Sequence, residues 1–313
     1  MPRRKTAVLY IFLKSDFQGF IMSDLGFIGI GKMGRPILYN ILKKYKVTGI
    51  YNRARQKADE FGALGIKVFQ YPFQVSSSCD IIFVMVTDSQ ASQEIISGKN
   101  GLLSHIIPGT IIVDMSTISL KASRENQARV AEKSCTYVDC PVIGSVPFAQ
   151  KGELTSIFGG DKKAFETVKP FLETFSKNVF YMGEGGNGLK MKLLHNLLLG
   201  ENLAALSEAL VFGDRMGMNR EQVMDILAVS SAASAILDIK REPLLKEDFI
   251  PAFLLNHEIK DINYALEMAR DSRISLPLGG LTSQMYSSAS SIGYGNLDMS
   301  SVIKAFKRIN GEK

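Results

Sequence analysis

The segment GEGGNGLKMKLLHN (183–196) places a lysine and an asparagine at a spacing that could support chemistry. Lys192 and Asn196 are four residues apart, so on a helix both side chains project from one face, which Gly188 shares one turn earlier. Burying a lysine on an otherwise apolar helix costs free energy unless the ammonium group has a partner or a task. Lys192 is therefore a candidate functional residue; the alternative is a core helix from which its ammonium group reaches solvent.

Two other polar residues of this segment point elsewhere. Lys190 lies on another face of the expected helix, and we assign it to solvent. His195 is also rotated away from Lys192 and Asn196, because successive helical residues are about 100° apart. We therefore expect neither to take part in the chemistry.

Two hydroxyl residues follow an expected strand in DMSTISL (114–120). Ser116 and Thr117 would present hydroxyl and amide groups at the carboxyl edge of a sheet, where ligands of such folds bind. The alternative, which is compatible with the first, is a turn or an N-cap for a helix that begins near Leu120.

A glycine and a serine follow another expected strand, in DCPVIGSVPFAQKGEL (139–154). Gly144 and Ser145 can turn consecutive backbone amides toward an anion. Both segments thus offer groups that could hold a carboxylate.

The stretch GFIGIGKMGRPI lies between an expected strand and an expected helix. Gly29 permits a tight turn out of the strand, Gly31 lets the backbone approach a pyrophosphate, and Gly34 lets the helix pack closely. Lys32 and Met33 occupy the same loop, which is expected to face the cofactor. The free amides and the dipole of the helix N-terminus favour an anion there. The stretch predicts dinucleotide binding.

The residues after the second strand, VTGIY, predict which dinucleotide binds. NAD sites usually carry an acidic residue here that holds the ribose hydroxyls, whereas this chain has Asn52 and Arg53. Asn52 can donate hydrogen bonds to a 2′-phosphate, and Arg53 can form a charged fork on it. We therefore expect NADP; the alternative is that Arg53 is only exposed and either cofactor is accepted.

These segments together resemble the β-hydroxyacid dehydrogenase family, which includes 3-hydroxyisobutyrate dehydrogenases and glyoxylate/succinic semialdehyde reductases. The resemblance extends over nearly the whole chain after Met22. The segments that carry it are the glycine-rich stretch with YNRARQKADEF, DMSTISL, DCPVIGSVPFAQKGEL, GEGGNGLKMKLLHN and FLLNHEIKDINYAL. It implies an NAD(P)-dependent oxidoreductase that moves a hydride reversibly between the nicotinamide and a small 3-hydroxy acid, semialdehyde or keto acid.

The resemblance also implies roles for individual residues. Lys192 would be the general acid and base. The residues expected at the substrate are Ser116, Gly144, Ser145 and Asn196. Lys260 would reach the nicotinamide region, Thr117 would also lie at the cofactor, and Asp261 would support the site. The alternative for Lys260 and Asp261 is a surface ion pair.

One segment departs from the commonest family form, which has a serine followed by two glycines. This chain reads Ile143, Gly144 and Ser145. The missing hydroxyl removes one substrate hydrogen bond and makes that side of the pocket more apolar.

Two other function classes share this fold. The first is an imine reductase, in which the lysine position typically carries another residue. The second is a non-catalytic, nucleosome-associated binding module that has lost the lysine. The presence of both Lys192 and Asn196 favours the enzyme over both alternatives.

The elements that must position these residues alternate between short apolar strands and helices up to about residue 187. This order predicts an α/β Rossmann domain over residues 22–187, with a doubly wound, mostly parallel sheet. Its strands are continuously apolar, as in a sheet covered on both faces. Residues 188–313 predict an all-helical domain joined by a long helix. Residues 1–21 read as a loose or mis-annotated tail.

Composition excludes several classes. Of the 313 residues, 46% are hydrophobic, and the net charge of +6 is spread over the chain, so a nucleic-acid partner is not favoured. No stretch is apolar enough for a membrane span. Three cysteines without metal-ligand spacing predict a reducing compartment, the cytoplasm, and no metal site. The apolar C-terminal helices predict a homodimer or homotetramer.

Overall fold

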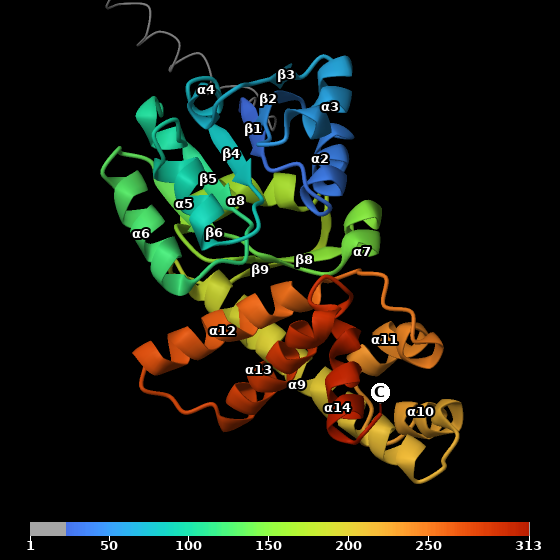
Figure 1. Cartoon of the computed structure of the whole chain (residues 1–313). Coiled ribbons are helices and arrows are strands. Elements are labelled where there is room, and N and C mark those ends of the chain that lie inside the picture. The colour runs from blue at the N-terminus through green and yellow to red at the C-terminus, as the bar shows by residue number, and fades with distance from the viewer. Residues whose placement is uncertain (1–22, 313) are drawn as a thin grey trace, which may run out of the picture.

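The computed structural model describes residues 23–312, so the expectation for residues 1–21 lies outside the described part. Figure 1 shows a part that contains the sheets and, below it, a part made of helices. The long helix α9 (Asn187–Arg215) begins beside the sheets and runs through the helical part. This arrangement confirms the predicted fold class.

The main sheet has six parallel strands in the order β3-β2-β1-β4-β5-β6. Their bounds are β1 (Leu25–Ile28), β2 (Val47–Tyr51), β3 (Lys67–Val68), β4 (Ile81–Val84), β5 (Ile111–Asp114) and β6 (Thr136–Asp139). The order reverses at β1, which pairs with β2 on one side and β4 on the other. Ligands of open parallel sheets bind where the strand order reverses, at the carboxyl ends of the strands.

Helices cover both faces of the main sheet (Figure 1). Phe27 and Phe83 pack toward α2 (Gly34–Leu42), α3 (Asp59–Ala63) and α8 (Lys162–Leu172). The neighbouring strand residues Ile28 and Ile82 face α4 (Pro72–Ser76), α5 (Ser89–Ser97) and α6 (Leu120–Ala131). Because consecutive residues point to opposite buried faces, the strands must be apolar throughout.

A second, smaller sheet lies beside the first and was not predicted. Its order is β7-β8-β9, with β7 (Val142–Ile143) antiparallel to β8 (Leu154–Phe158) and β9 (Ser176–Tyr181) parallel to β8. The short helix α7 (Val146–Lys151) lies between β7 and β8 in the chain. The chain thus leaves the main sheet at Asp139 and enters the second sheet at Val142.

The helical part surrounds the far two thirds of α9. Its helices are α10 (Arg220–Ala228), α11 (Ala235–Lys246), α12 (Leu255–Asp271), α13 (Pro277–Ala289) and α14 (Ile303–Ile309). Apolar residues of all of them form one core with α9, including Leu203 and Leu210. Within residues 23–312, no helix is both long and apolar enough to cross a membrane.

A buried carboxylate joins the two parts. Asp139, at the end of β6, accepts hydrogen bonds from the amides of Gly186 (2.5 Å) and Leu189 (2.7 Å). These amides belong to the first turn of α9, whose free N–H groups need such an acceptor. Burial raises the pKa of Asp139 to about 6, against the effect of these hydrogen bonds. Asp139 therefore holds the start of α9 against the carboxyl end of the main sheet.

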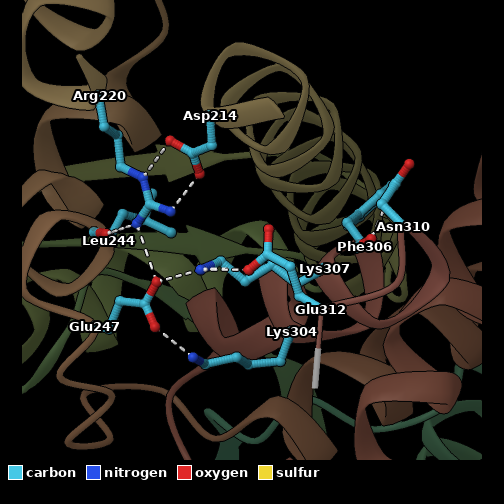
Figure 2. Close-up of polar contacts among 9 residues, drawn as sticks. All are labelled: Asp214, Arg220, Leu244, Glu247, Lys304, Phe306, Lys307, Asn310 and Glu312. Atoms are coloured by element: carbon cyan, nitrogen blue, oxygen red, sulfur yellow. Dashed lines mark hydrogen bonds and ion pairs between the residues drawn. The ribbon is translucent and has the colours of Figure 1, made fainter. Parts of the chain in front are cut away.

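An ion-pair cluster ties the far end of the helical part together (Figure 2). Glu247, just after α11, accepts hydrogen bonds from Lys304 and from Lys307 (2.5 Å), both on α14. Arg220, at the start of α10, bridges Glu247 (3.3 Å) to Asp214 on α9. Burial opposes ionisation of Glu247, but the two lysines lower its pKa from 4.5 to about 2. The cluster connects α9, α10, the end of α11 and α14.

We expect Glu247→Gln to lower the free energy of unfolding by about 1–3 kcal/mol at pH 7, because charged hydrogen bonds are lost. The folded-state pKa of Glu247 is depressed, so its contribution is present above pH 4.5 and fades as the pH falls toward 2. Urea unfolding followed by circular dichroism at several pH values measures both effects. Glu242→Gln is the control, because Glu242 is exposed and its ion pair with Lys246 lies at the surface. A destabilisation by Glu247→Gln that stays constant down to pH 3 would contradict this account.

Candidate active site

Two of the predicted site residues, Thr117 and Lys260, meet where the carboxyl end of the main sheet contacts α12. Lys260 on α12 donates a hydrogen bond to the backbone oxygen of Thr117, which follows β5, at 2.8 Å. Nearby, the hydroxyl oxygen of Tyr264 accepts a hydrogen bond from the hydroxyl group of Ser89 at 2.9 Å. Figure 1 shows α12 crossing directly under the sheet-containing part. These contacts hold the two parts against each other around the candidate site.

The glycine loop after β1 has the shape that a dinucleotide requires. Gly29 has a φ of +97°, and a Cβ atom there would lie 2.0 Å from the backbone oxygen of Met85. A Cβ atom on Gly34 would lie 1.9 Å from the backbone oxygen of Gly29, so the helix could not pack as it does. A Cβ atom on Gly31, by contrast, would have no atom of residues 23–312 within 4 Å apart from its chain neighbours. This open space, next to the N-terminus of α2, fits a bound pyrophosphate.

The two residues between these glycines differ in their surroundings. Lys32 is exposed beside Gly31, where its charge can attract an anion. Met33 is half-buried and packs against the sheet core, at the N-cap of α2. The structure thus leaves Lys32 open to the candidate cofactor site, while the Met33 side chain is part of the packing.

The two residues after β2 also differ. The Asn52 side chain accepts a hydrogen bond from the amide of Ile30 (2.8 Å) and donates one to the backbone oxygen of Ala54 (2.7 Å). Asn52 therefore fixes the glycine loop, and only one amide hydrogen is left for a ligand. The guanidinium of Arg53 is exposed and has no hydrogen bond or ion pair within residues 23–312. Arg53 is the side chain at this strand end that remains free for a phosphate.

Ser116 lies deeper than expected. Its side chain is 1% exposed, and its hydroxyl oxygen accepts a hydrogen bond from the amide of Val86 at 2.9 Å. The amide of Ser116 donates to the carboxylate of Asp114 at 2.9 Å. The Ser116 hydroxyl thus links the ends of two strands, and its place at the substrate stays a prediction. The N-cap of α6 is Ser119, so the alternative reading of Ser116 or Thr117 as that cap is wrong.

Gly144 and Ser145 form the turn between β7 and α7. Gly144 is exposed with a φ of +126°, and a Cβ atom there would lie 2.6 Å from the Leu154 side chain. Ser145 is half-buried at the N-cap of α7, and its side chain makes no capping hydrogen bond. The turn therefore exposes backbone at Gly144 and leaves the Ser145 hydroxyl uncommitted.

The face of α9 that was predicted from the spacing of Lys192 and Asn196 contacts α12 through Asn196. Asn196 is buried and donates a hydrogen bond to the carboxylate of Asp261 on α12 at 2.6 Å. Asp261 also pairs with Lys260 at 2.5 Å. Lys190 points away, as expected, and bonds only its neighbour Asn187 within the described chain. His195, in contrast, is not remote, because its Nδ1 lies 2.8 Å from the side-chain oxygen of Asn196.

Lys192 is half-buried on this face and makes no hydrogen bond within residues 23–312. Burial lowers the pKa of its ammonium group, and the positive charge of Lys260 acts in the same direction. The negative charges of Asp261 and Glu258 oppose this shift. The charge of Lys192, after burial, also lowers the pKa of His195. Lys192 therefore gives up its proton more easily than a lysine in water, as a general acid and base requires.

Three groups at the site were not identified from the sequence. The Ser89–Tyr264 pair joins residues far apart in the chain, and no local pattern marks it. Glu258 is fully buried on α12, and its spacing of three from Asp261 was the available signal.

Within the described residues, no cluster of three or more His, Cys, Asp or Glu side chains could hold a metal ion.

Family models match both parts of the chain. Residues 24–183 match the family described as the NAD binding domain of 6-phosphogluconate dehydrogenase. Residues 186–306 match the family described as the NAD-binding domain of NADP-dependent 3-hydroxyisobutyrate dehydrogenase. The two matches together cover nearly all of the described chain.

Individual relatives extend the comparison. The chain is 34% identical to glyoxylate/succinic semialdehyde reductase 1 of Arabidopsis thaliana over 91% of this chain and 98% of the relative. A solved structure, Psf3 in complex with NADP+ and 2-OPP, superposes with a TM-score of 0.79 at 27% identity, over 90% of this chain and 99% of the other. The human cytokine-like nuclear factor N-PAC is 30% identical over 90% of this chain, which spans 51% of that relative. The chain belongs to the β-hydroxyacid dehydrogenase family of NAD(P)-dependent oxidoreductases.

Proposed function

We propose that this protein is an NADP(H)-dependent reductase of a small semialdehyde or keto acid, such as succinic semialdehyde or glyoxylate. The observation that carries the proposal is the pair of Lys192 and Asn196 on one face of α9. That face opens at the contact with α12 and the carboxyl edge of the main sheet. The Arabidopsis thaliana relative that is 34% identical is named as a reductase of these two compounds.

Lys192 would act on the oxygen atom of the substrate. The cofactor, when bound, supplies or accepts the hydride at the carbonyl carbon. In reduction, the Lys192 ammonium donates a proton to the developing alkoxide and stabilises its charge. In oxidation, the same group must be a neutral amine, and its lowered pKa makes that form accessible. One residue therefore serves both directions.

Other residues of the site would hold the substrate carboxylate. The exposed turn at Gly144 and Ser145 offers backbone amides and one uncommitted hydroxyl. Asn196 has one amide hydrogen left after its bond to Asp261. Ile143 stands where the commonest family form has a serine, so this side of the pocket favours an apolar part of the substrate. Ser116 would support this binding indirectly, because its hydroxyl group links the segments that follow β4 and β5.

Preference for NADP rests on Arg53. Its exposed guanidinium has no partner within residues 23–312, and the strand end carries no acidic residue that would repel a 2′-phosphate. Lys260 would take part less directly, because it is bonded to the Thr117 oxygen and to Asp261. These bonds bring Thr117 and Lys260 together, and we expect the nicotinamide end of the cofactor to lie beside them.

A non-catalytic binding module remains the second candidate, because N-PAC shares 30% identity with this chain. Oxidation of NADPH in the presence of succinic semialdehyde, compared with a DNA shift assay at physiological salt, separates the two functions. The enzyme predicts substrate-dependent oxidation and no shift. A shift without turnover would favour the binding module.

We expect the wild type to use NADPH more efficiently than NADH. Arg53→Ala should raise KM for NADPH by about tenfold, because a charged hydrogen bond to the 2′-phosphate is lost. KM for NADH should change little. The control is Arg124→Ala, an exposed arginine on α6. Steady-state kinetics with both cofactors measure the effect, and a wild type that prefers NADH tenfold would contradict the assignment.

Lys192→Ala should lower turnover by about 10² to 10⁴, the range typical of general acid–base catalysis, with NADPH affinity nearly unchanged. Lys192→Arg should restore little, because a guanidinium hardly releases its proton. Lys190→Ala, on the exposed face of the same helix, is the matched control and should be nearly silent. Single-turnover kinetics and cofactor titration measure the two effects. An essential Lys190 with a dispensable Lys192 would mean that the wrong face of α9 has been assigned.

We also infer a homodimer or homotetramer. The support is a set of exposed apolar side chains on α9 and α13, namely Leu194, Leu198, Leu278 and Leu281. Monomeric proteins rarely expose such clusters. Sedimentation velocity at micromolar concentration should show a dimer or a larger species, and Leu198→Glu should shift it toward monomer. A wild type that sediments only as a monomer would rule this out.

A further inference from the structure

His195 lies beside the two residues of α9 to which the proposed function gives the chemistry. It is three residues after Lys192, so the two side chains are neighbours on the helix surface. Its Nδ1 atom lies 2.8 Å from Oδ1 of Asn196, which is a hydrogen-bonding distance. The ring is half-buried, and the proposed reaction does not use it.

The orientation of the Asn196 amide group follows from its other partner, Asp261. A carboxylate only accepts hydrogen bonds, so the Asn196 atom that lies 2.6 Å from Oδ2 of Asp261 must be the amide nitrogen. The carboxylate is itself fixed, because its Oδ1 accepts a hydrogen bond from Lys260 at 2.5 Å. Lys260 also donates to the backbone oxygen of Thr117 at 2.8 Å. The amide oxygen of Asn196 therefore faces His195.

This amide oxygen determines which ring nitrogen of His195 carries the proton. An amide oxygen only accepts hydrogen bonds, so Nδ1 of His195 must be the donor. In the neutral ring Nε2 is then unprotonated, because the hydrogen bond at one nitrogen selects the tautomer. Burial lowers the pKa of His195 and the charge of Lys192 acts in the same direction, while the bond to Asn196 opposes them. The surroundings thus favour a neutral His195 that is protonated at Nδ1.

These bonds leave the buried Asn196 side chain with one free group. Its oxygen is occupied by His195, and one amide hydrogen is bonded to Asp261. The second amide hydrogen remains, and it can only donate. A ligand that contacts this side chain must therefore offer an acceptor, and a charged acceptor forms the stronger hydrogen bond. A free amide oxygen, by contrast, would repel a carboxylate and would accept from a ligand that carries N–H groups.

We propose that His195 is a positioning residue that acts through Asn196: its Nδ1–H group occupies the Asn196 oxygen, so that Asn196 presents only a donor and selects a substrate carboxylate. This inference rests on the proposed function and names the part of the substrate that Asn196 recognises. His195 itself transfers no proton to the substrate. Because Nδ1 carries a proton in the protonated ring as well, both forms make the hydrogen bond.

The first test observes the proton in wild-type protein whose histidine rings are labelled with ¹⁵N. The chain has three histidines, so the ring signals that are lost in His195→Leu identify His195. At pH 8, above the usual histidine pKa of about 6.5, the ¹⁵N shifts distinguish a protonated from an unprotonated ring nitrogen. We expect a protonated Nδ1 and an unprotonated Nε2. A ring protonated at Nε2, or an equal mixture of the two tautomers, would overturn the proposal.

The second test compares succinic semialdehyde with its amide, 4-oxobutanamide, in which a neutral group with N–H donors replaces the carboxylate. His195→Leu should lower the ratio of kcat/KM for the acid to that for the amide by about three- to tenfold, the effect of one ordinary hydrogen bond. His195→Asn keeps an N–H donor near the position of Nδ1 and should restore most of the ratio. His105→Leu, which changes an exposed histidine that packs on Phe73, is the control.

A loss of stability alone would lower the rates with both compounds and leave their ratio unchanged. An unchanged ratio in a folded His195→Leu protein, or a ratio that His195→Asn does not restore, would overturn the proposal. If His195→Leu does not fold, His195→Gln takes its place, because its donor lies at the position of Nε2. The NMR measurement needs no turnover. It therefore tests His195 even if the wild type reduces none of the aldehydes, an outcome that would count against the proposed function alone.

Discussion

The geometry of the site depends on how Asp139 holds the first turn of α9. Its carboxylate accepts the amides of Gly186 and Leu189, and it comes directly from β6 of the main sheet. Lys192 lies one turn after Leu189, so its position relative to the sheet edge follows from this attachment. Without it, the face of α9 that carries Lys192 would no longer be fixed relative to the glycine loop, which we propose to bind the cofactor. A single buried acceptor thus links cofactor binding to the proposed chemistry.

The second constraint is the contact between α9 and α12. Asn196 and Asp261 bond across it, Gly200 lets the helices approach, and Glu258 fills the space that the glycine leaves. This contact excludes water from one side of Lys192, which lowers the pKa of the ammonium group, while the two carboxyl groups limit how far it falls. The site thus balances desolvation against nearby charge, as enzymes commonly do to tune a general acid and base.

Features with a local sequence signal could be predicted, and features that depend on distant partners could not. The glycine loop and the face of Lys192 and Asn196 follow from spacing within one turn or one helix. Asn52 fixes the loop through an amide 22 residues away, and the hydroxyl of Ser116 joins a strand 30 residues away. The burial of Glu258 depends on a glycine of another helix, Gly200. The second sheet was missed because its first strand has two residues and directly follows β6.

The most direct test of this account is a crystal structure of the protein with NADP+ and a small hydroxy acid, such as glycolate or 4-hydroxybutyrate. The account predicts that Nζ of Lys192 lies within about 2.6–3.2 Å of the substrate hydroxyl oxygen. The carboxylate should contact the turn at Gly144 and Ser145, and the adenosine 2′-phosphate should contact Arg53. A hydroxy acid bound with no α9 side chain near its hydroxyl group would contradict the central claim.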